Sequence, residues 1–164
     1  MSNIILIGMP GSGNSTVGVL LAKALGYSFE DVDLVISRRA GKPLQKILDE
    51  DGLDSFLTLE EAVGSTLAAD HTVIATGGSM VLSEAAMAHL QTMGMVVYID
   101  VPFAEIERRV TNIRTRGIAF HKNETLADVY RERQPLYERY AAMTVKIKPG
   151  DTIEDTVDNL IEQL

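Results

Sequence analysis

The sequence predicts an α/β protein in which helices cover both faces of a mostly parallel β-sheet. Short apolar runs of strand length alternate with longer segments of helical period, as in repeated β-α-β units. A glycine-rich loop directly follows the first apolar run and precedes a helical segment. Polar clusters follow several of the predicted strands, and parallel strands place their carboxyl ends at one edge of a sheet. We therefore expect a single domain, residues 1–164, with a ligand site at that edge.

The first half of the chain begins with a strand and a helix joined by the glycine-rich loop. Residues 4–7 are all aliphatic, which suits a strand buried on both faces. Apolar residues then recur at helical spacing from Val17 to Leu25, and Gly26 is a favourable helix end. The pattern further predicts a strand from residue 27 to about 29, helices over 32–40, about 43–50 and about 54–69, and a strand over 72–76.

The second half continues this alternation. Ser83 is a suitable N-cap for a helix that reaches about Met93, and residues 95–99 form a β-branched strand. A helix begins near Pro102, and periodicity then fails between about residues 111 and 124, a polar and basic stretch that we interpret as a lid-like loop. The last predicted elements are a helix over 125–141, a strand over 144–147 and a helix over 152–164.

Composition excludes several classes of protein. The formal net charge of -8 argues against general affinity for nucleic acid or anionic membranes. The absence of cysteine excludes disulfides, thiol nucleophiles and cysteine-ligated metals. No apolar run approaches the ~18 residues that span a bilayer, and the first residues enter a strand directly, so we expect a cytoplasmic protein. The alternating pattern predicts no exposed apolar patch, which favours a monomer.

The glycine-rich loop has the spacing of a phosphate-binding loop, with glycines at 8 and 13 and a hydroxyl at Ser15. Its backbone amides and the positive end of the following helix favour an anion, and the Ser15 hydroxyl suits a magnesium ion that bridges two phosphates. An ordinary tight turn is the alternative, but the strand, spacing, hydroxyl and helix together favour phosphate. The residues expected at the nucleotide are Gly11, Ser12, Gly13, Asn14, Ser15 and Thr16.

Two acidic residues follow the second predicted strand. Asp31 and Asp33 are two positions apart at a strand end, so they point to different places. One can hold a metal-bound water while the other orients or deprotonates a substrate hydroxyl; alternatively, one or both cap the helix that follows. After the third strand, Gly77-Gly78 permits close approach of a ligand to the backbone, although a plain turn explains this pair equally well.

Basic residues mark two further places. Arg116 lies in the lid-like loop of about residues 111–124, which can close over a nucleotide and bring charge to the transferred phosphate; a solvated loop is the alternative. Arg133 lies on the same predicted helix as Tyr137. It can bind a carboxylate in bidentate fashion or form a surface ion pair with Glu132 or another nearby acid.

These residues resemble the shikimate kinase family of small nucleoside-monophosphate-kinase-like enzymes, over essentially the whole chain. Several motifs occur in the family's order, which is more specific than the phosphate loop alone. The motifs are residues 8–16, Phe29-Glu30-Asp31-Val32-Asp33, Phe56 followed by Glu60, Ala75-Thr76-Gly77-Gly78, Arg116 in the lid-like loop, and Arg133-Gln134-Pro135-Leu136-Tyr137.

The resemblance implies a P-loop kinase fold, a three-layer α/β/α sandwich with a five-stranded parallel sheet. It also implies an enzyme that uses ATP and Mg²⁺ to phosphorylate the 3-hydroxyl of shikimate in aromatic amino-acid biosynthesis. By motif match, Ser15 and Asp31 serve the magnesium, and Asp33 holds the acceptor hydroxyl. The other implied positions are Gly77, Gly78 and Ser79 beside the acceptor, Arg133 at its carboxylate, Arg116 over the phosphates and Arg109 at the adenine.

Four departures separate this sequence from the family pattern. Asn14 replaces the loop lysine, and losing one such charge contact typically costs ~3–4 kcal/mol in the barrier. Leu57 replaces an arginine that pairs with the shikimate carboxylate, and Ser79 replaces a third glycine. The lid sequence Arg116-Gly117-Ile118 replaces Arg-Pro-Leu. Three hypotheses follow: a shikimate kinase, a kinase for another hydroxylated metabolite, and a nucleotide-binding protein that has lost catalysis.

Overall fold

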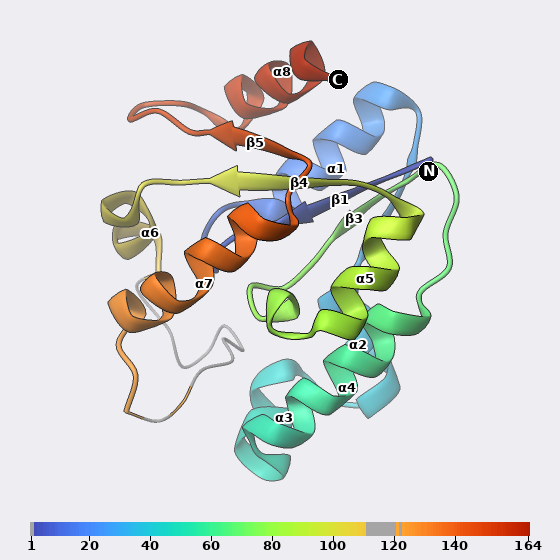
Figure 1. The fold of residues 1–164 in the computed structure, drawn as a ribbon, viewed down its shortest axis with the longest axis vertical. Helices are drawn as coiled ribbons and strands as arrows, with labels where there is room; N and C mark the ends of the chain where they lie inside the picture. Colours follow the sequence, from blue (N-terminus) through green and yellow to red (C-terminus); the bar gives the residue numbers. More distant parts are fainter. Residues whose placement is uncertain (1, 111–120, 122) are drawn as a thin grey trace.

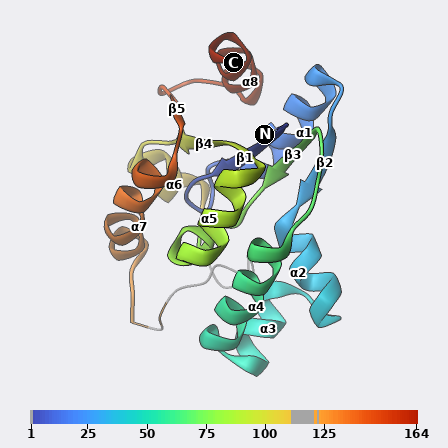
Figure 2. The ribbon, with the colours of Figure 1, turned by 45° about the vertical axis from the view of Figure 1, so that its right-hand side comes forward.

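A computed structural model describes residues 2–110, 121 and 123–164, and its centre is a five-stranded parallel sheet (Figure 1). The strand order is β2-β3-β1-β4-β5, and Figure 2 shows the strands side by side in this order. Every neighbouring pair is parallel. The strands are β1 (Asn3–Ile7), β2 (Ser28–Asp31), β3 (Thr72–Ala75), β4 (Gly94–Asp100) and β5 (Met143–Lys146).

Helices cover both faces of this sheet, which confirms the predicted α/β/α sandwich. Helices α1 and α8 pack against each other on one face, where α1 contacts β3 and α8 contacts β5. Helices α5 and α7 contact β4 on the opposite face, and α4 packs against α5 (Figure 1). The helices are α1 (Asn14–Leu25), α2 (Val32–Ala40), α3 (Leu44–Asp51), α4 (Leu53–Thr66), α5 (Glu84–Met93), α6 (Phe103–Arg109), α7 (Leu126–Tyr140) and α8 (Ile153–Gln163).

The central strand β1 is buried along its whole length, as its aliphatic sequence predicts. Ile5 pairs with Ile74 of β3 on one side and with Val96 of β4 on the other. The first residue of β4 has to be glycine because a Cβ at Gly94 would lie only 1.9 Å from the carbonyl oxygen of Asn3. The register of the central strands therefore depends on one missing side chain.

Side-chain caps fix the beginnings of α5, α7 and α8. The Ser83 hydroxyl accepts a hydrogen bond from the Ala86 amide at the start of α5, as the sequence predicts. Thr125 and Thr152 each form a reciprocal capping box, at the starts of α7 and α8. These caps satisfy amides that have no partner within the helix, which explains why the predicted starts agree with the structure.

The end of α4 is the clearest difference from the predicted elements. The apolar pattern predicts a helix to about Ala69, but α4 ends at Thr66 and Leu67 is extended, with φ -60° and ψ 140°. The Leu67 carbonyl oxygen lies 2.6 Å from Nε2 of His89 on α5. The chain has to leave the helix here to bring Thr72 into β3, so a tertiary requirement overrides the helical period.

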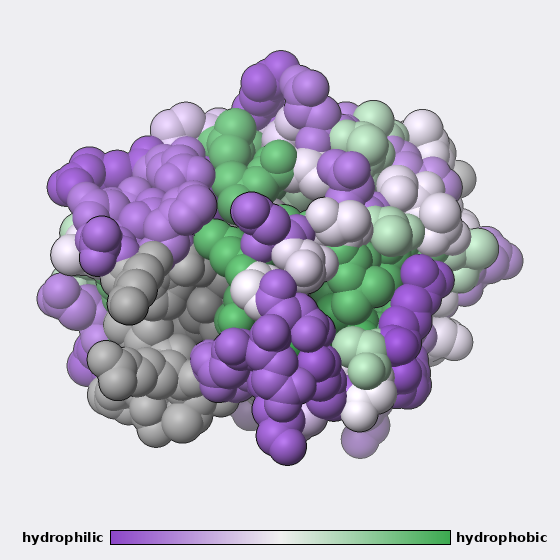
Figure 3. All heavy atoms as spheres, turned by 90° about the horizontal axis from the view of Figure 1, so that it is seen from below, coloured by the Kyte–Doolittle hydropathy of each residue, from purple (hydrophilic) through white to green (hydrophobic). Residues whose placement is uncertain are grey.

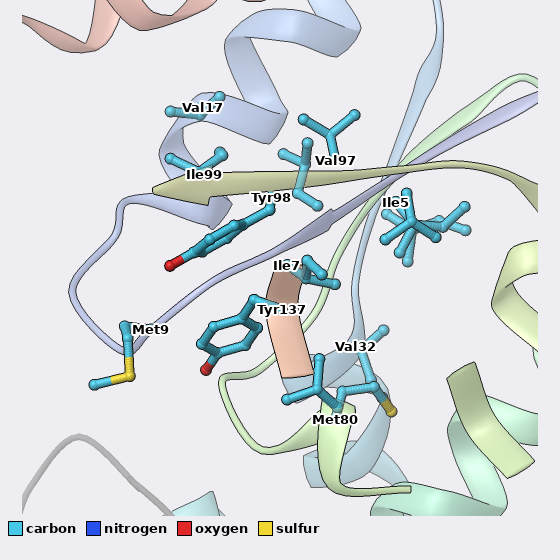
Figure 4. Packing of buried hydrophobic residues seen from close by; sticks show 14 of the residues in the cluster. Ile5, Ile7, Met9, Val17, Val32, Met80, Val97, Tyr98, Ile99 and Tyr137 are labelled. Carbon is cyan, nitrogen blue, oxygen red and sulfur yellow. The ribbon is translucent and has the colours of Figure 1, made fainter. Parts of the chain in front are cut away.

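Two tyrosines join α7 to the sheet. The rings of Tyr98, on β4, and Tyr137, on α7, stack with their centroids 5.1 Å apart. Figure 4 shows both hydroxyl groups directed toward the end of the sheet where Met9 lies. Tyr137 is fully buried, at 0% exposure. The stack therefore fixes α7 beside the carboxyl ends of the strands.

The surface is largely hydrophilic on the face that Figure 3 presents, with hydrophobic atoms recessed between polar side chains. Among the helices that the structure describes, none has the length and apolar character needed to cross a lipid bilayer.

Candidate active site

A cavity of about 590 Å³ lies at the carboxyl ends of the central strands. This is the edge at which parallel α/β sheets bind ligands, and it is where the polar clusters of the sequence are predicted to meet. Three loops form much of its wall: the phosphate loop after β1, the start of α2 after β2, and the glycine pair after β3. The predicted site residues in its lining are Gly11, Ser12, Gly13, Asn14, Ser15, Thr16, Asp33, Gly77, Gly78, Ser79, Arg109 and Arg133.

The phosphate loop has the tight conformation that its glycines predict. Gly13 has a left-handed backbone, with φ 86°, immediately before α1 begins. The amide of Ser12 donates to the carbonyl of Met9 at 3.0 Å, which closes the turn. Left-handed geometry is inexpensive for glycine and strained for other residues. The loop thus brings backbone amides and the amino end of a twelve-residue helix to the cavity.

Asn14 is held inside the loop by its own side-chain amide. Its Oδ1 accepts a hydrogen bond from the Ser12 hydroxyl at 2.8 Å, and its Nδ2 donates to the Thr76 carbonyl at 3.5 Å. The residue is only 8% exposed, although it lines the cavity. An uncharged, internally bonded group therefore occupies the position at which the phosphate-loop pattern has lysine.

Asp31 caps the helix that follows it, which is one of the alternatives that the sequence left open, and it also contacts Ser15. Its Oδ1 accepts from the Asp33 amide at 3.0 Å, which makes it the N-cap of α2. Its Oδ2 accepts from the Ser15 hydroxyl at 2.9 Å. A carboxylate at the end of β2 and a hydroxyl in the first turn of α1 thus lie side by side. Mg²⁺ takes oxygen ligands of this kind and completes its shell with water and substrate phosphates, so this pair fits that ion.

No larger metal centre is found: in the described part of the chain, no cluster of three or more histidine, cysteine, aspartate or glutamate side chains could hold a metal ion. A magnesium ion at Ser15 and Asp31 would therefore depend on phosphate oxygens for the rest of its coordination, as is usual where the ion is bound together with a nucleotide.

Asp33 is a partly buried carboxylate that lines the cavity. Burial, and to a lesser extent the nearby charge of Asp31, raises the pKa of Asp33 to about 6. A Cβ at Gly77 would lie 2.8 Å from Asp33 Oδ1, so a side chain at position 77 would displace this carboxylate. A raised pKa in a cavity suits a general base, because such a group binds a proton more readily than an ordinary aspartate.

Glu60, on α4, is the site residue that sequence reasoning did not single out by role. It is 2% exposed, and its carboxylate accepts hydrogen bonds from the Ser79 hydroxyl at 2.8 and 2.9 Å. Burial is the main cause that raises the pKa of Glu60 to about 7; the Ser79 hydrogen bond opposes it. The only signal in the sequence was a glutamate spaced four residues after Phe56, on the apolar face of the helix.

Arg133 is buried, at 3% exposure, and lines the cavity. Of the two alternatives for Arg133, the surface ion pair with Glu132 or another nearby acid is therefore wrong, because the tertiary fold turns Arg133 inward while Glu132 stays exposed. One helical turn further along α7, the Tyr137 hydroxyl donates to the Gly78 carbonyl at 2.7 Å. Helix α7 thus supplies a guanidinium to the cavity and anchors the glycine pair.

Arg109 lies at the opposite side of the phosphate loop, at the end of α6. Its Nη1 donates to the Gly11 carbonyl at 3.1 Å, and its Nε donates to Glu105 at 3.0 Å. Arg116 and most of the predicted lid-like loop lie outside the described residues. Leu57 packs against the hydrophobic core, and it is not part of the cavity wall.

This arrangement of phosphate loop, hydroxyl–carboxylate pair, partly buried aspartate and buried arginine on a 2-3-1-4-5 sheet defines a small-molecule kinase of the P-loop class. A family model described as Shikimate kinase matches residues 10–164. The chain belongs to the shikimate kinase family, which confirms the resemblance seen in the sequence.

Similarity to individual members extends over nearly the whole chain. A shikimate kinase of Thermosynechococcus vestitus is 37% identical over 99% of this chain and 90% of its own length. A shikimate kinase of Thermobifida fusca is 38% identical over 98% of this chain and 93% of its own length. The structure of a shikimate kinase from Acinetobacter baumannii in complex with shikimate is similar with a TM-score of 0.90 and 30% identity, covering 99% of this chain and 92% of that one.

Proposed function

We propose that this protein transfers the γ-phosphoryl group of ATP to the 3-hydroxyl group of shikimate. The observation that carries this proposal is Asp33, a carboxylate with a pKa raised to about 6 in the same cavity as the phosphate loop and Arg133. Family membership supports the reaction, and the Acinetobacter baumannii relative in complex with shikimate supports the acceptor.

The acceptor end of the cavity is assigned to three groups. The Asp33 carboxylate accepts the proton of the acceptor hydroxyl as its oxygen bonds to the γ-phosphorus and the bond from phosphorus to the β–γ bridging oxygen breaks. Arg133 binds the acceptor carboxylate through its guanidinium. The backbone at Gly77 and Gly78 borders the acceptor, and the Tyr137–Gly78 hydrogen bond holds this border in place.

The nucleotide end is assigned to the phosphate loop and its neighbours. The loop amides from Gly11 to Thr16 receive the phosphates, and Arg109 is assigned to the adenine from the family resemblance. Ser15 and Asp31 would hold Mg²⁺, which neutralises charge on the phosphates when it is bound. Arg116, which lies outside the described residues, is assigned to the phosphates from the family motif alone.

Asn14 sets the rate in this proposal. Backbone amides bind phosphate without it, but the loop lacks the charge that normally stabilises the transferred group. At ~3–4 kcal/mol for one such contact, we expect Asn14→Lys to raise kcat by about two to three orders of magnitude.

The test is ADP release with ATP, Mg²⁺ and shikimate for the unaltered protein and for Asn14→Lys. Asn159→Lys, on α8 and away from the cavity, is the matched control and should leave kcat unchanged. Asp33→Asn in the Asn14→Lys protein should abolish the gain. If neither protein turns over shikimate, the acceptor is wrong, and thermal-shift screening of hydroxylated metabolites identifies a replacement. If neither binds nucleotide, the phosphate-loop assignment fails.

The remaining assignments concern partners. The net charge of -8 supports a small-molecule acceptor and no nucleic-acid partner. We further propose a monomer, which size-exclusion chromatography with light scattering tests directly. The cytoplasmic location stays a prediction.

A further inference from the structure

The buried pair of Ser79 and Glu60 lies at the acceptor end of the cavity and has no role in the proposed transfer. Both residues line the cavity wall, and they are only 4% and 2% exposed. The Ser79 hydroxyl is shared between the two carboxylate oxygens of Glu60, at 2.8 and 2.9 Å. A buried carboxylate is costly unless hydrogen bonds or opposite charges compensate it. The Ser79 hydroxyl therefore stabilises the buried Glu60 carboxylate.

The surroundings of Glu60 explain why a hydroxyl is needed. A Cβ at Gly77 would lie 2.8 Å from Asp33 Oδ1 and 3.5 Å from Glu60 Oε2, so this glycine borders both carboxylates. The charge of Asp33 disfavours an ionised Glu60, whereas Arg133 favours it. A third ionisable group that faces Glu60 is Tyr137.

Helix α4 itself offers Glu60 no positive charge. Residues Leu53–Thr66 contain neither lysine nor arginine. Leu57, three positions before Glu60 and thus on the same side of the helix, packs against the hydrophobic core. The Ser79 hydroxyl is therefore the one neighbour, among the described hydrogen bonds of Glu60, that fixes where this carboxylate points.

We infer that Ser79 is a positioning residue that orients the Glu60 carboxylate as a second hydroxyl acceptor beside Asp33. The inference rests on the proposed function. It adds one contact to that acceptor site: a second acceptor hydroxyl donates to Glu60, whose orientation depends on the Ser79 hydroxyl.

The first experiment needs no substrate. Glu60 protonation is followed through the pH dependence of unfolding between pH 5 and 9, for the wild-type protein and for Ser79→Ala. Ser79→Ala removes a hydrogen bond to a charged group. The pH at which Glu60 is half protonated in the folded protein, the Glu60 midpoint, should therefore rise by about one pH unit. The same substitution in a Glu60→Gln protein should cause no pH-dependent change. An unchanged midpoint would overturn the inference.

The second experiment uses the kinase assay with shikimate at pH 7. Ser79→Ala should raise KM for the acceptor about tenfold, leave KM for ATP within twofold, and move the acidic limb of kcat/KM to higher pH. Ser79→Thr, which keeps the hydroxyl, should restore most of the acceptor affinity, and the exposed control Ser55→Ala should behave as wild type. Equal changes in both KM values, with an unmoved pH profile, would reduce Ser79 to a packing residue and contradict the inference.

The two experiments separate the two proposals. A protein that releases no ADP with shikimate in any variant, but whose Glu60 midpoint moves in Ser79→Ala, would overturn the proposed acceptor while supporting the coupling of Ser79 to Glu60.

Discussion

Replacing Glu60 with glutamine should stabilise the folded protein strongly at alkaline pH. In the folded state the Glu60 pKa is raised from 4.5 to about 7, chiefly by burial. The folded protein therefore binds a proton more tightly than the unfolded chain between these pH values, and stability falls as pH rises through this window. Above it, the ionised side chain costs about 3 kcal/mol, at ~1.4 kcal/mol per unit.

Glutamine has the shape of the protonated acid and keeps an oxygen that accepts from the Ser79 hydroxyl. Glu60→Gln should therefore recover about 3 kcal/mol at pH 8. For a domain of this size that corresponds to a rise in Tm of about 6–12 °C. At pH 4 the Glu60 carboxyl group is mainly protonated in both the folded and the unfolded state. The wild-type and Glu60→Gln proteins should therefore have the same free energy of unfolding at this pH.

The assay is urea unfolding followed by circular dichroism at pH 4, 6 and 8. Glu132→Gln, the same change at an exposed glutamate of α7, is the matched control and should shift stability by less than about 0.5 kcal/mol. A gain of equal size at pH 4 and pH 8, or none at pH 8, would refute the attribution of the raised pKa to burial of an ionised group. The expected gain in stability should be accompanied by weaker acceptor binding, because Glu60→Gln removes a carboxylate of the acceptor site.

Three further outcomes are expected. In the Glu60→Gln protein, where Glu60 no longer titrates, kcat/KM for shikimate should fall about tenfold per pH unit below pH 6 because Asp33 becomes protonated; a flat profile down to pH 5 would exclude Asp33 as the base. Tyr137→Phe should lower the unfolding free energy by about 1–3 kcal/mol in urea, since the Gly78 carbonyl loses its buried donor; unchanged stability would contradict this. Gly94→Ala should cost at least ~2 kcal/mol in the same measurement because its Cβ would meet the Asn3 carbonyl of β1 at 1.9 Å, and a variant as stable as wild type would show that the strands can separate there.

Local chemistry predicted the order of the elements and most of their ends. Strand β1 is aliphatic at four of its five residues, and the threonines before α7 and α8 each have an aspartate three residues later, so these elements are specified by neighbours in sequence. The phosphate loop was predictable for the same reason, because glycine spacing encodes a backbone conformation.

Tertiary packing decided what local patterns left open. The end of α4 depends on where β3 has to begin. The hydrophobic periodicity of the α4 sequence carries no information on the position of β3. Arg133 could face solvent or the cavity, and only the packing of α7 against β4, through the stacked rings of Tyr98 and Tyr137, turns it inward.

The role of Asn14 and the environment of Glu60 were equally hidden. The sequence by itself determined that a lysine is missing from the phosphate loop and that α4 carries a glutamate beside a leucine. Only the folded chain bonds Asn14 to Thr76, 62 residues away, and brings Ser79 to Glu60 across 19 residues. Burial and pKa depend on every neighbour in space, whereas the sequence pattern records only neighbours along the chain.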